Sequence, residues 1–167
     1  MKEMEATRTT LQETMTFMTA LAYGMEQMAD RGANGMAFVA GKKLGAKLAE
    51  TSQKTDDITQ ALDTVRKLLS ANHCNWGFET FKRKAQPTLI TKGADGAEKL
   101  ELVFRDCMIR QSLFRYGHVQ KGSMCYMMYG FFSGALEAIL GRRAVLEVTH
   151  AGQNACLKCL TVHSKES

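Results

Sequence analysis

Four side chains in the last third of the chain have the types and the spacing of a metal site. They are Cys125, His150, Cys156 and Cys159, which form the pattern C-x24-H-x5-C-x2-C. Structural zinc sites are closed and take four tetrahedral ligands, usually thiolates and imidazoles. The pattern therefore predicts a zinc site, and iron is the other metal that such a ligand set fits.

The predicted site joins two distant parts of the chain. Cys125 falls in the first turn of a predicted helix, where the helix dipole favours a thiolate. Glu147 competes with His150 as a ligand because both lie near the end of one predicted strand. Two other interpretations of the clustered cysteines stay open, namely buried free thiols and a redox C-x-x-C pair. Cys74 and Cys107 lie outside the pattern and are predicted to be core cysteines.

A second group of side chains predicts a pocket for a small hydrophobic ligand. Small-molecule sites are mostly apolar with a few polar anchors, and the 11 methionines of the chain suit either a core or an adaptable pocket. His118 either faces this pocket, ligates a haem iron or is simply exposed. The other candidates also suit an ordinary core. They are Trp76, Phe78, Phe104, Met128, Tyr129, Phe131 and Phe132.

Apolar periodicity predicts that helices occupy the first half of the chain. Steps of three and four residues predict a helix over 8–29, a break at 31–35 and a second helix over 36–50. Gly41 and Gly45 lie one turn apart in the second helix, which predicts the close passage of another backbone or of a ligand. A third helix is expected to begin with Thr55 as its N-cap. Its apolar face is Ile58, Ala61, Leu62, Val65, Leu68 and Leu69.

The second half changes to the period of two residues that is typical of strands. Residues 108–116 either extend a strand or form a loop. The predicted strands are 76–80, 144–149 and 156–163, together with a hairpin of 88–91 and 100–104 around the turn at 93–96.

One predicted helix is apolar almost all round. Ser123 is expected to cap it, and it runs over 124–140 and ends at Gly141. A helix without a polar face belongs in the centre of a core. The elements together predict an α+β fold, with N-terminal helices packed on an antiparallel sheet, this buried helix and a C-terminal hairpin.

Length, charge and cysteine count limit the class of protein. The 167 residues fit one domain spanning 1–167. The net charge of +5 is spread in short clusters without an aromatic-and-basic signature, so no nucleic-acid partner is expected. Residues 1–5 have no apolar stretch, and no run of apolar residues is long enough to span a membrane. Five cysteines, an odd number, argue against a disulfide framework, and we expect a reducing, cytoplasmic location.

The segment 122–141, with the strands around 145–150 and 156–162, resembles the 4-vinyl reductase domain family. These are predicted hydrocarbon-binding proteins that share a fold with subunits of the TRAPP trafficking complex. His150 stands where that family has a middle cysteine, the spacing to the final cysteine is one residue longer, and Cys156 is an additional thiol. The residues that match are Cys125, Gly130, Phe131, Gly134, Glu147 and Cys159.

The resemblance implies a zinc site beside a ligand chamber, a TRAPP-like ligand-binding fold and often a homodimer. The zinc ligands would be Cys125, Cys159 and two of Glu147, His150 and Cys156. We therefore expect a zinc-containing domain that binds or senses a hydrophobic or tetrapyrrole-like molecule. One alternative is a protein-interaction module or assembly chaperone. Another is a subunit of a tetrapyrrole vinyl reductase, although the sequence has no nicotinamide or flavin fingerprint.

Overall fold

The computed structural model describes residues 2–74, 76–107, 109–110 and 120–165. Its strands form an antiparallel sheet in the order β1-β3-β5-β4, and β2 adds to β3. The predicted α+β class is thus confirmed. In chain order the elements are α1 (Lys2–Ala29), α2 (Arg31–Ala49), α3 (Ile58–Ala71), β1 (Trp76–Phe81), β2 (Thr91–Lys92), β3 (Glu98–Cys107), α5 (Ser123–Leu140), β4 (Ala144–Ala151) and β5 (Cys156–Val162).

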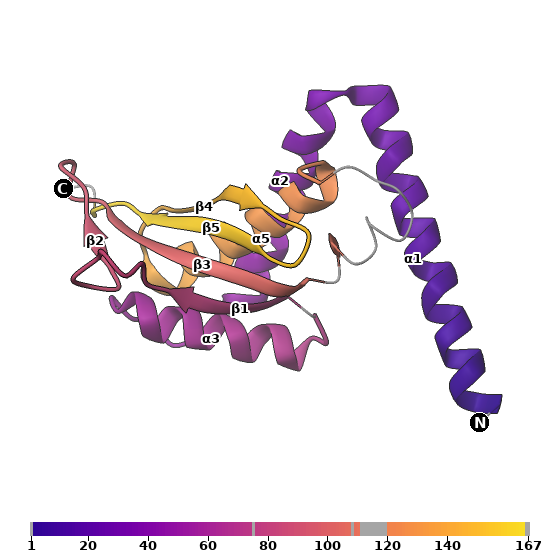
Figure 1. Ribbon diagram of the computed structural model, residues 1–167, viewed down its shortest axis with the longest axis horizontal. Coiled ribbons are helices and arrows are strands. Elements are labelled where there is room, and N and C mark those ends of the chain that lie inside the picture. The colour runs from indigo at the N-terminus through magenta and orange to yellow at the C-terminus, as the bar shows by residue number, and fades with distance from the viewer. Residues whose placement is uncertain (1, 75, 108, 111–119, 166–167) are drawn as a thin grey trace.

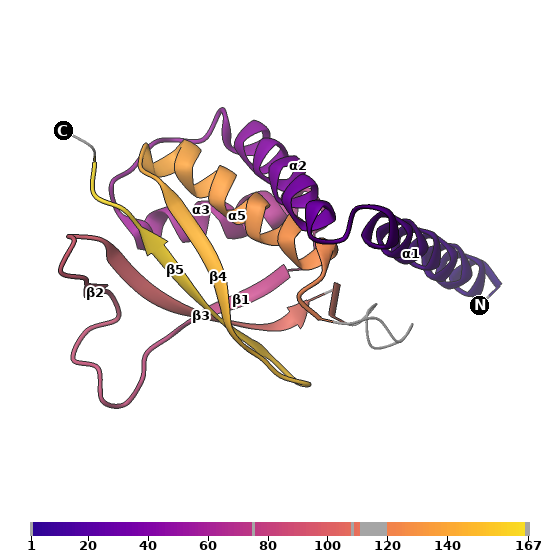
Figure 2. The same ribbon diagram turned by 90° about the horizontal axis from the view of Figure 1, so that it is seen from above.

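The helices α2, α3 and α5 lie on one face of the sheet, with α2 packed along α5 (Figure 2). None of the described helices covers the opposite face. Side chains alternate along β5 between these two faces. Lys158, Leu160 and Val162 point toward the helices and are buried, whereas the residues between them are half-buried on the other face.

Helix α5 is the centre of the core, as its apolar sequence predicts. Phe131, Phe132, Leu136 and Ile139 have no exposed side-chain surface. A helix that is buried on every side needs partners all round. The sheet, α2 and α3 supply those partners.

Close packing of α2 on α5 depends on glycines in both helices. A Cβ atom on Gly45 would lie 2.0 Å from the Phe131 carbonyl oxygen, and one on Gly41 would lie 1.9 Å from that of Met127. In the reverse direction, a Cβ on Gly130 or Gly134 would lie 2.0 Å from a carbonyl oxygen of α2. Real Cβ atoms do not approach backbone this closely, so only glycine fits. Of the two predicted alternatives, it is another backbone, that of α5, and not a ligand that passes close to Gly41 and Gly45.

Helix α1 extends away from the rest of the molecule (Figure 1). The chain turns between α1 and α2 at Asp30, whose φ of 45° is left-handed. The predicted break at 31–35 is wrong because this one residue makes the turn and those residues already belong to α2. None of the helices that the structure describes is long and apolar enough to cross a membrane.

The N-terminus of α5 is capped from another helix. Glu26 of α1 accepts hydrogen bonds from the backbone N–H and the hydroxyl of Ser123, both at 2.7 Å. Ser123 is thus the first residue of the helix rather than its cap, and Gly122 holds the N-cap position. This contact fixes the start of α5 against α1.

The caps and turns of the other elements differ in detail from the sequence prediction. Asp57, not Thr55, is the N-cap of α3, and it accepts from the backbone N–H groups of Thr59 and Gln60. The β2–β3 hairpin turns as predicted, with Gly96 at a φ of 76°. Strand β4 carries a bulge between Val148 and His150, where its register against β5 shifts.

Candidate functional site

Five aromatic side chains pack together between α5 and the sheet, and we call them the aromatic cluster. The ring centroid of Phe132 lies 5.3 Å from the centroid of Phe78 and 5.3 Å from that of Phe104. Trp76 contacts Phe131 edge-on, also at 5.3 Å. All five are buried. Phe104, Phe131 and Phe132 were predicted to contact the ligand. The structure places all three in the core, where they pack against other aromatic side chains.

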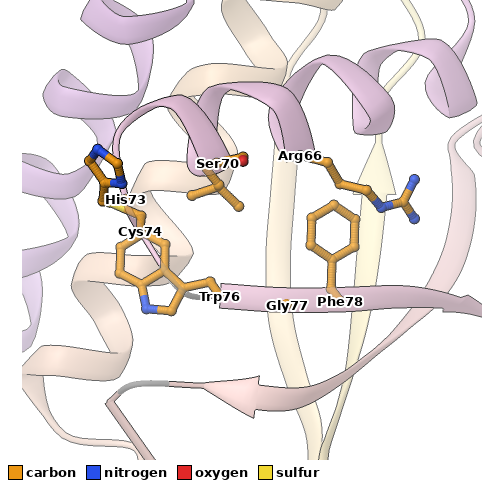
Figure 3. Close-up of a pocket in the computed structure, with 8 residues that line it drawn as sticks. Arg66, Ser70, His73, Cys74, Trp76, Gly77 and Phe78 are labelled. Carbon is orange, nitrogen blue, oxygen red and sulfur yellow. The ribbon is translucent and has the colours of Figure 1, made fainter.

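The edge of this cluster borders a cavity of about 460 Å³ between α3 and β1 (Figure 3). We call it the α3–β1 pocket. Two of the predicted ligand residues, Trp76 and Phe78, line it from β1. A cavity of this size suits a small organic molecule. Its full lining is Arg66, Leu69, Ser70, His73, Cys74, Trp76, Gly77 and Phe78.

The polar side chains of this pocket come mainly from α3 and the residues directly after it. Arg66 and Ser70 are four residues apart and so lie on one side of α3, and His73 follows the end of that helix at a left-handed φ of 54° (Figure 3). The Arg66 guanidinium carbon lies 4.6 Å from the centroid of the Phe78 ring. The buried indole N–H of Trp76 has no hydrogen-bond partner among the described residues. The pocket therefore combines aromatic walls with several hydrogen-bond donors.

Sequence reasoning missed Arg66, Ser70 and His73. The available signal was the position of Arg66 and Ser70 along the border of the apolar face of α3, whose Leu69 lines the same pocket. Of the sequence-predicted candidates, His118 lies outside the described residues.

Cys74 also lines the α3–β1 pocket. The pKa of its thiol is raised because burial disfavours the thiolate.

A second, nearly closed pocket surrounds the amine of Lys158, and we call it the Lys158 pocket. Its free volume is about 10 Å³, roughly the space of one water molecule. Two predicted ligand residues, Met128 and Tyr129, line this pocket rather than the larger one. The full lining is Cys107, Arg110, Gln120, Lys121, Cys125, Met128, Tyr129, Val148, Ala151, Cys156 and Lys158.

Lys158 is 2% exposed although it carries an amine. Its Nζ atom donates to the Met128 sulfur at 3.6 Å and lies 4.3 Å and 4.8 Å from the ring centroids of Phe104 and Tyr129. These contacts stabilise an ammonium ion only weakly in place of water. Burial consequently lowers the pKa of Lys158, although the nearby thiols of Cys107 and Cys125 act in the opposite direction.

Burial also decides the protonation of the groups around this amine. It raises the pKa of Cys125, and the positive charge of Lys158 offsets only part of that effect. The pKa of the Tyr129 hydroxyl is raised for the same reason, with the thiols of Cys125 and Cys156 adding to it. The Cys125 thiol and the Tyr129 phenol are therefore both neutral at neutral pH.

The structure does not bring the five predicted metal ligands together. Cys125 and Cys156 meet at the Lys158 pocket. Cys159 pairs across the sheet with Glu147, on the face turned away from α5, and His150 pairs with Leu157 on the same face. A separation of three residues puts Cys156 and Cys159 on opposite faces of a strand. No group of three or more candidate ligands that could hold a metal ion occurs within the part of the chain that the structure describes.

Comparison with known proteins relates this chain by fold to solved structures. No protein-family model matches the sequence, and no curated protein is significantly similar to it. The chain is similar to the phenol-responsive sensory domain of the transcription activator PoxR, whose crystal structure contains phenol. The TM-score is 0.57 at 17% sequence identity, over 86% of this chain and 73% of the other. At this identity the similarity concerns the fold.

Proposed function

We propose that the protein is a small-molecule binding or sensing domain and that its ligand is a small aromatic compound held in the α3–β1 pocket. The observation that carries this proposal is the cavity of about 460 Å³ beside the aromatic cluster. Aromatic walls favour a planar apolar ring, and a few donors among them fix its orientation. Arg66, Ser70 and His73, which line the pocket, supply the donors for a ligand oxygen.

The fold comparison supports the same proposal. The PoxR domain is described as phenol-responsive, and phenol is an aromatic ring with one polar oxygen. A ligand of that kind matches the aromatic walls and the donors of the α3–β1 pocket. Transfer of a sensing role to this chain rests on shared fold and is part of the proposal.

Other parts of the sequence interpretation stay predictions. Membership of the 4-vinyl reductase domain family, a tetrapyrrole ligand and a vinyl reductase activity are tested by nothing in the structure. Gly130 and Gly134, which carry part of that resemblance, have a packing role against α2. A zinc ion also stays a prediction, and β5 places two of its predicted ligands, Cys156 and Cys159, on opposite faces of the sheet.

We further propose that the exposed apolar side chains of α1 and α2 bind a second copy of the chain. The projecting helix α1 exposes Phe17, Met18 and Leu21, and α2 exposes Met36 and Val39. Exposed apolar surface of this kind is typical of interaction sites. Each chain carries both of these surfaces. Their exposed charges are opposite, because α1 has the acid Glu13, whereas residues 36–49 of α2 have the lysines 43 and 47. Two copies that exchange α1 would cover both.

The dimer is tested by the oligomeric state of the whole chain. Light scattering after size-exclusion chromatography is expected to give twice the mass of one chain, and Phe17→Glu with Leu21→Glu should give one mass. Thr16→Glu, at an exposed residue on the opposite side of the same helix, is the control and should leave the dimer intact. A monomeric unaltered chain would overturn the dimer without affecting the ligand pocket.

The ligand proposal is tested by titrating the protein with phenol. Trp76 is the single tryptophan of the chain and lines the pocket, so its fluorescence reports binding there directly. Phenol is expected to change this fluorescence with a saturable dependence on concentration. Ser70→Phe, which fills the pocket, should weaken binding by tenfold or more, about 1.4 kcal/mol.

The control for this test is Lys67→Phe, which adds the same ring to an exposed residue of α3 outside the pocket. It should bind phenol as the unaltered protein does. Absence of saturable binding, or equal affinity in the Ser70→Phe protein, would refute the proposed pocket. Circular dichroism of both variants checks that α3 remains folded.

A further inference from the structure

The charges around the α3–β1 pocket lead to a narrower statement about its ligand. We infer that this ligand is an aromatic carboxylate, with its ring against Trp76 and Phe78 and its carboxylate paired with Arg66. The inference rests on the proposed function, since it concerns the same pocket. It goes beyond that function because it sets the charge of the ligand.

The lining of the pocket has positive groups without negative ones. Of its eight residues, Arg66 carries a permanent positive charge and His73 can gain one, and none is Asp or Glu. Burial raises the pKa of the Cys74 thiol, so this group is neutral at physiological pH and adds no negative charge. An anionic ligand would therefore meet attraction from the walls of the pocket.

Arg66 is free to change its partner. Its Nη1 atom pairs with Asp63 three residues earlier, and the two side chains are 39% and 56% exposed. Exposed pairs of this kind contribute little free energy. Its remaining N–H groups donate to no partner among the described residues. Arginine offers two parallel donors in the geometry that a carboxylate accepts, so it favours this anion over a single oxygen.

The position of Arg66 matches a ligand that joins a ring to a carboxylate. The guanidinium lies over Phe78, at 4.6 Å from its centroid, and Phe78 is also a wall of the pocket. In Figure 3 the guanidinium lies on the side of Phe78 that is away from Trp76. Arg66 would therefore leave its exposed pair with Asp63 and turn toward Trp76 to bind a carboxylate whose ring lies in the pocket. Ser70, further along α3, and His73, just after the helix, supply additional donors. The polar groups that line the pocket can thus all donate to an anion.

The test compares benzoate with benzyl alcohol, which has the same ring and a neutral oxygen. Acetate provides the anion without the ring. Titrations followed by Trp76 fluorescence are expected to give benzoate an affinity at least tenfold higher than that of benzyl alcohol, and acetate a much lower affinity than either. Charge-assisted hydrogen bonds to a guanidinium are strong enough for a difference of about that size.

A matched pair of variants assigns the preference to one side chain. Arg66→Gln should bring the affinities for benzoate and benzyl alcohol to within about twofold of each other. Lys67→Gln removes a neighbouring exposed charge outside the pocket and should leave the preference unchanged. Thermal unfolding of each variant verifies that it is folded.

The outcomes separate this inference from the proposed function. If benzyl alcohol or phenol binds as tightly as benzoate, or if the preference survives Arg66→Gln, the aromatic carboxylate is wrong and the aromatic pocket stands. If none of the three aromatic probes binds, the inference and the proposed function both fail. If acetate binds as tightly as benzoate, the pocket is an anion site without selectivity for a ring, and the inference is also wrong.

Discussion

The two pockets at the ends of the aromatic cluster contrast in how they hold a positive charge. In the α3–β1 pocket, Arg66 stacks on Phe78 at the border of a cavity of about 460 Å³ and remains partly exposed. In the Lys158 pocket, the amine stacks on Phe104 in a space of about 10 Å³ and is 2% exposed. Phe78 and Phe104 are themselves in contact, at 5.5 Å between centroids.

This difference separates a binding role from a structural one. A solvated cation beside open space exchanges water or a weak partner for a ligand at low cost. A desolvated cation in a filled space has already lost its water, and no ligand of useful size fits beside it. The same type of contact, a cation over an aromatic ring, therefore suits the proposed ligand binding in one pocket and packing in the other.

The largest effect is expected from disturbing α5, which lines the Lys158 pocket and carries Phe131 and Phe132 of the aromatic cluster between the two pockets. Gly45→Ala places a Cβ 2.0 Å from the Phe131 carbonyl oxygen, so α2 must move away from α5. We expect a loss of about 2–3 kcal/mol in the free energy of unfolding, measured by urea denaturation. Gly35→Ala, in the same helix with nothing within 4 Å of the new Cβ, is the control and should be neutral or stabilising by up to about 1 kcal/mol. Equal results for the two variants would contradict the close helix contact.

A smaller effect is expected from Lys158→Met, which keeps the length of the side chain and removes the buried amine. The folded-state pKa of Lys158 is lowered from 10.5. The unfolded chain therefore binds more protons between the two pKa values, and the stability of the unaltered protein should rise with pH across that window. Below it, the ammonium is buried at full cost. Lys158→Met should thus stabilise the protein at neutral pH by about 1–3 kcal/mol and abolish the rise.

The control for this change is Lys99→Met, since Lys99 is exposed on β3. It should leave both the stability and its pH dependence close to those of the unaltered protein. Urea denaturation at several pH values between neutral and the unfolded pKa measures the effect. Loss of stability in Lys158→Met at neutral pH would mean that the amine has a partner that stabilises it.

The smallest effect concerns the accessibility of two cysteines. Cys74 lines the open pocket, whereas Cys107 is 4% exposed and lines the closed one. A neutral maleimide should label Cys74 several-fold faster than Cys107, as followed by peptide mass spectrometry, because labelling needs access to the thiolate. Since the pKa of Cys74 is raised from 9.0, its rate should still increase above pH 9.0. Phenol at saturating concentration should slow Cys74 alone, and equal rates for the two thiols would remove the contrast between the pockets.

Much of the fold follows from local pattern. The apolar face of α3, the central helix α5 and the strands of the C-terminal hairpin were predicted near their observed bounds, because each has a clear apolar pattern in the sequence. Caps were less predictable. Thr55 and Ser123 have cap-forming side chains, but Asp57 and the distant Glu26 make the hydrogen bonds, and a carboxylate from another helix leaves no local signal.

The site shows where sequence reasoning was incomplete. The alternation of β5 was visible before any coordinates, and it places Cys156 and Cys159 on opposite faces once both belong to one strand. The same alternation puts Lys158 in line with the buried Leu160 and Val162. A C-x-x-C pair can share one ion when it lies in a turn. Cys156 and Cys159 both belong to the predicted strand 156–163, which already argues against a shared ion.

The sequence by itself determined the elements and the composition of their faces, because helix and strand periods act over a few residues. The tertiary structure alone decided that Arg66 and Trp76 border one cavity, that Phe131 and Phe132 belong to the core, and that Lys158 is desolvated. Cavities and desolvation arise from contacts between residues far apart in the chain. Their positions depend on how closely whole elements pack, which here was fixed by the glycines between α2 and α5.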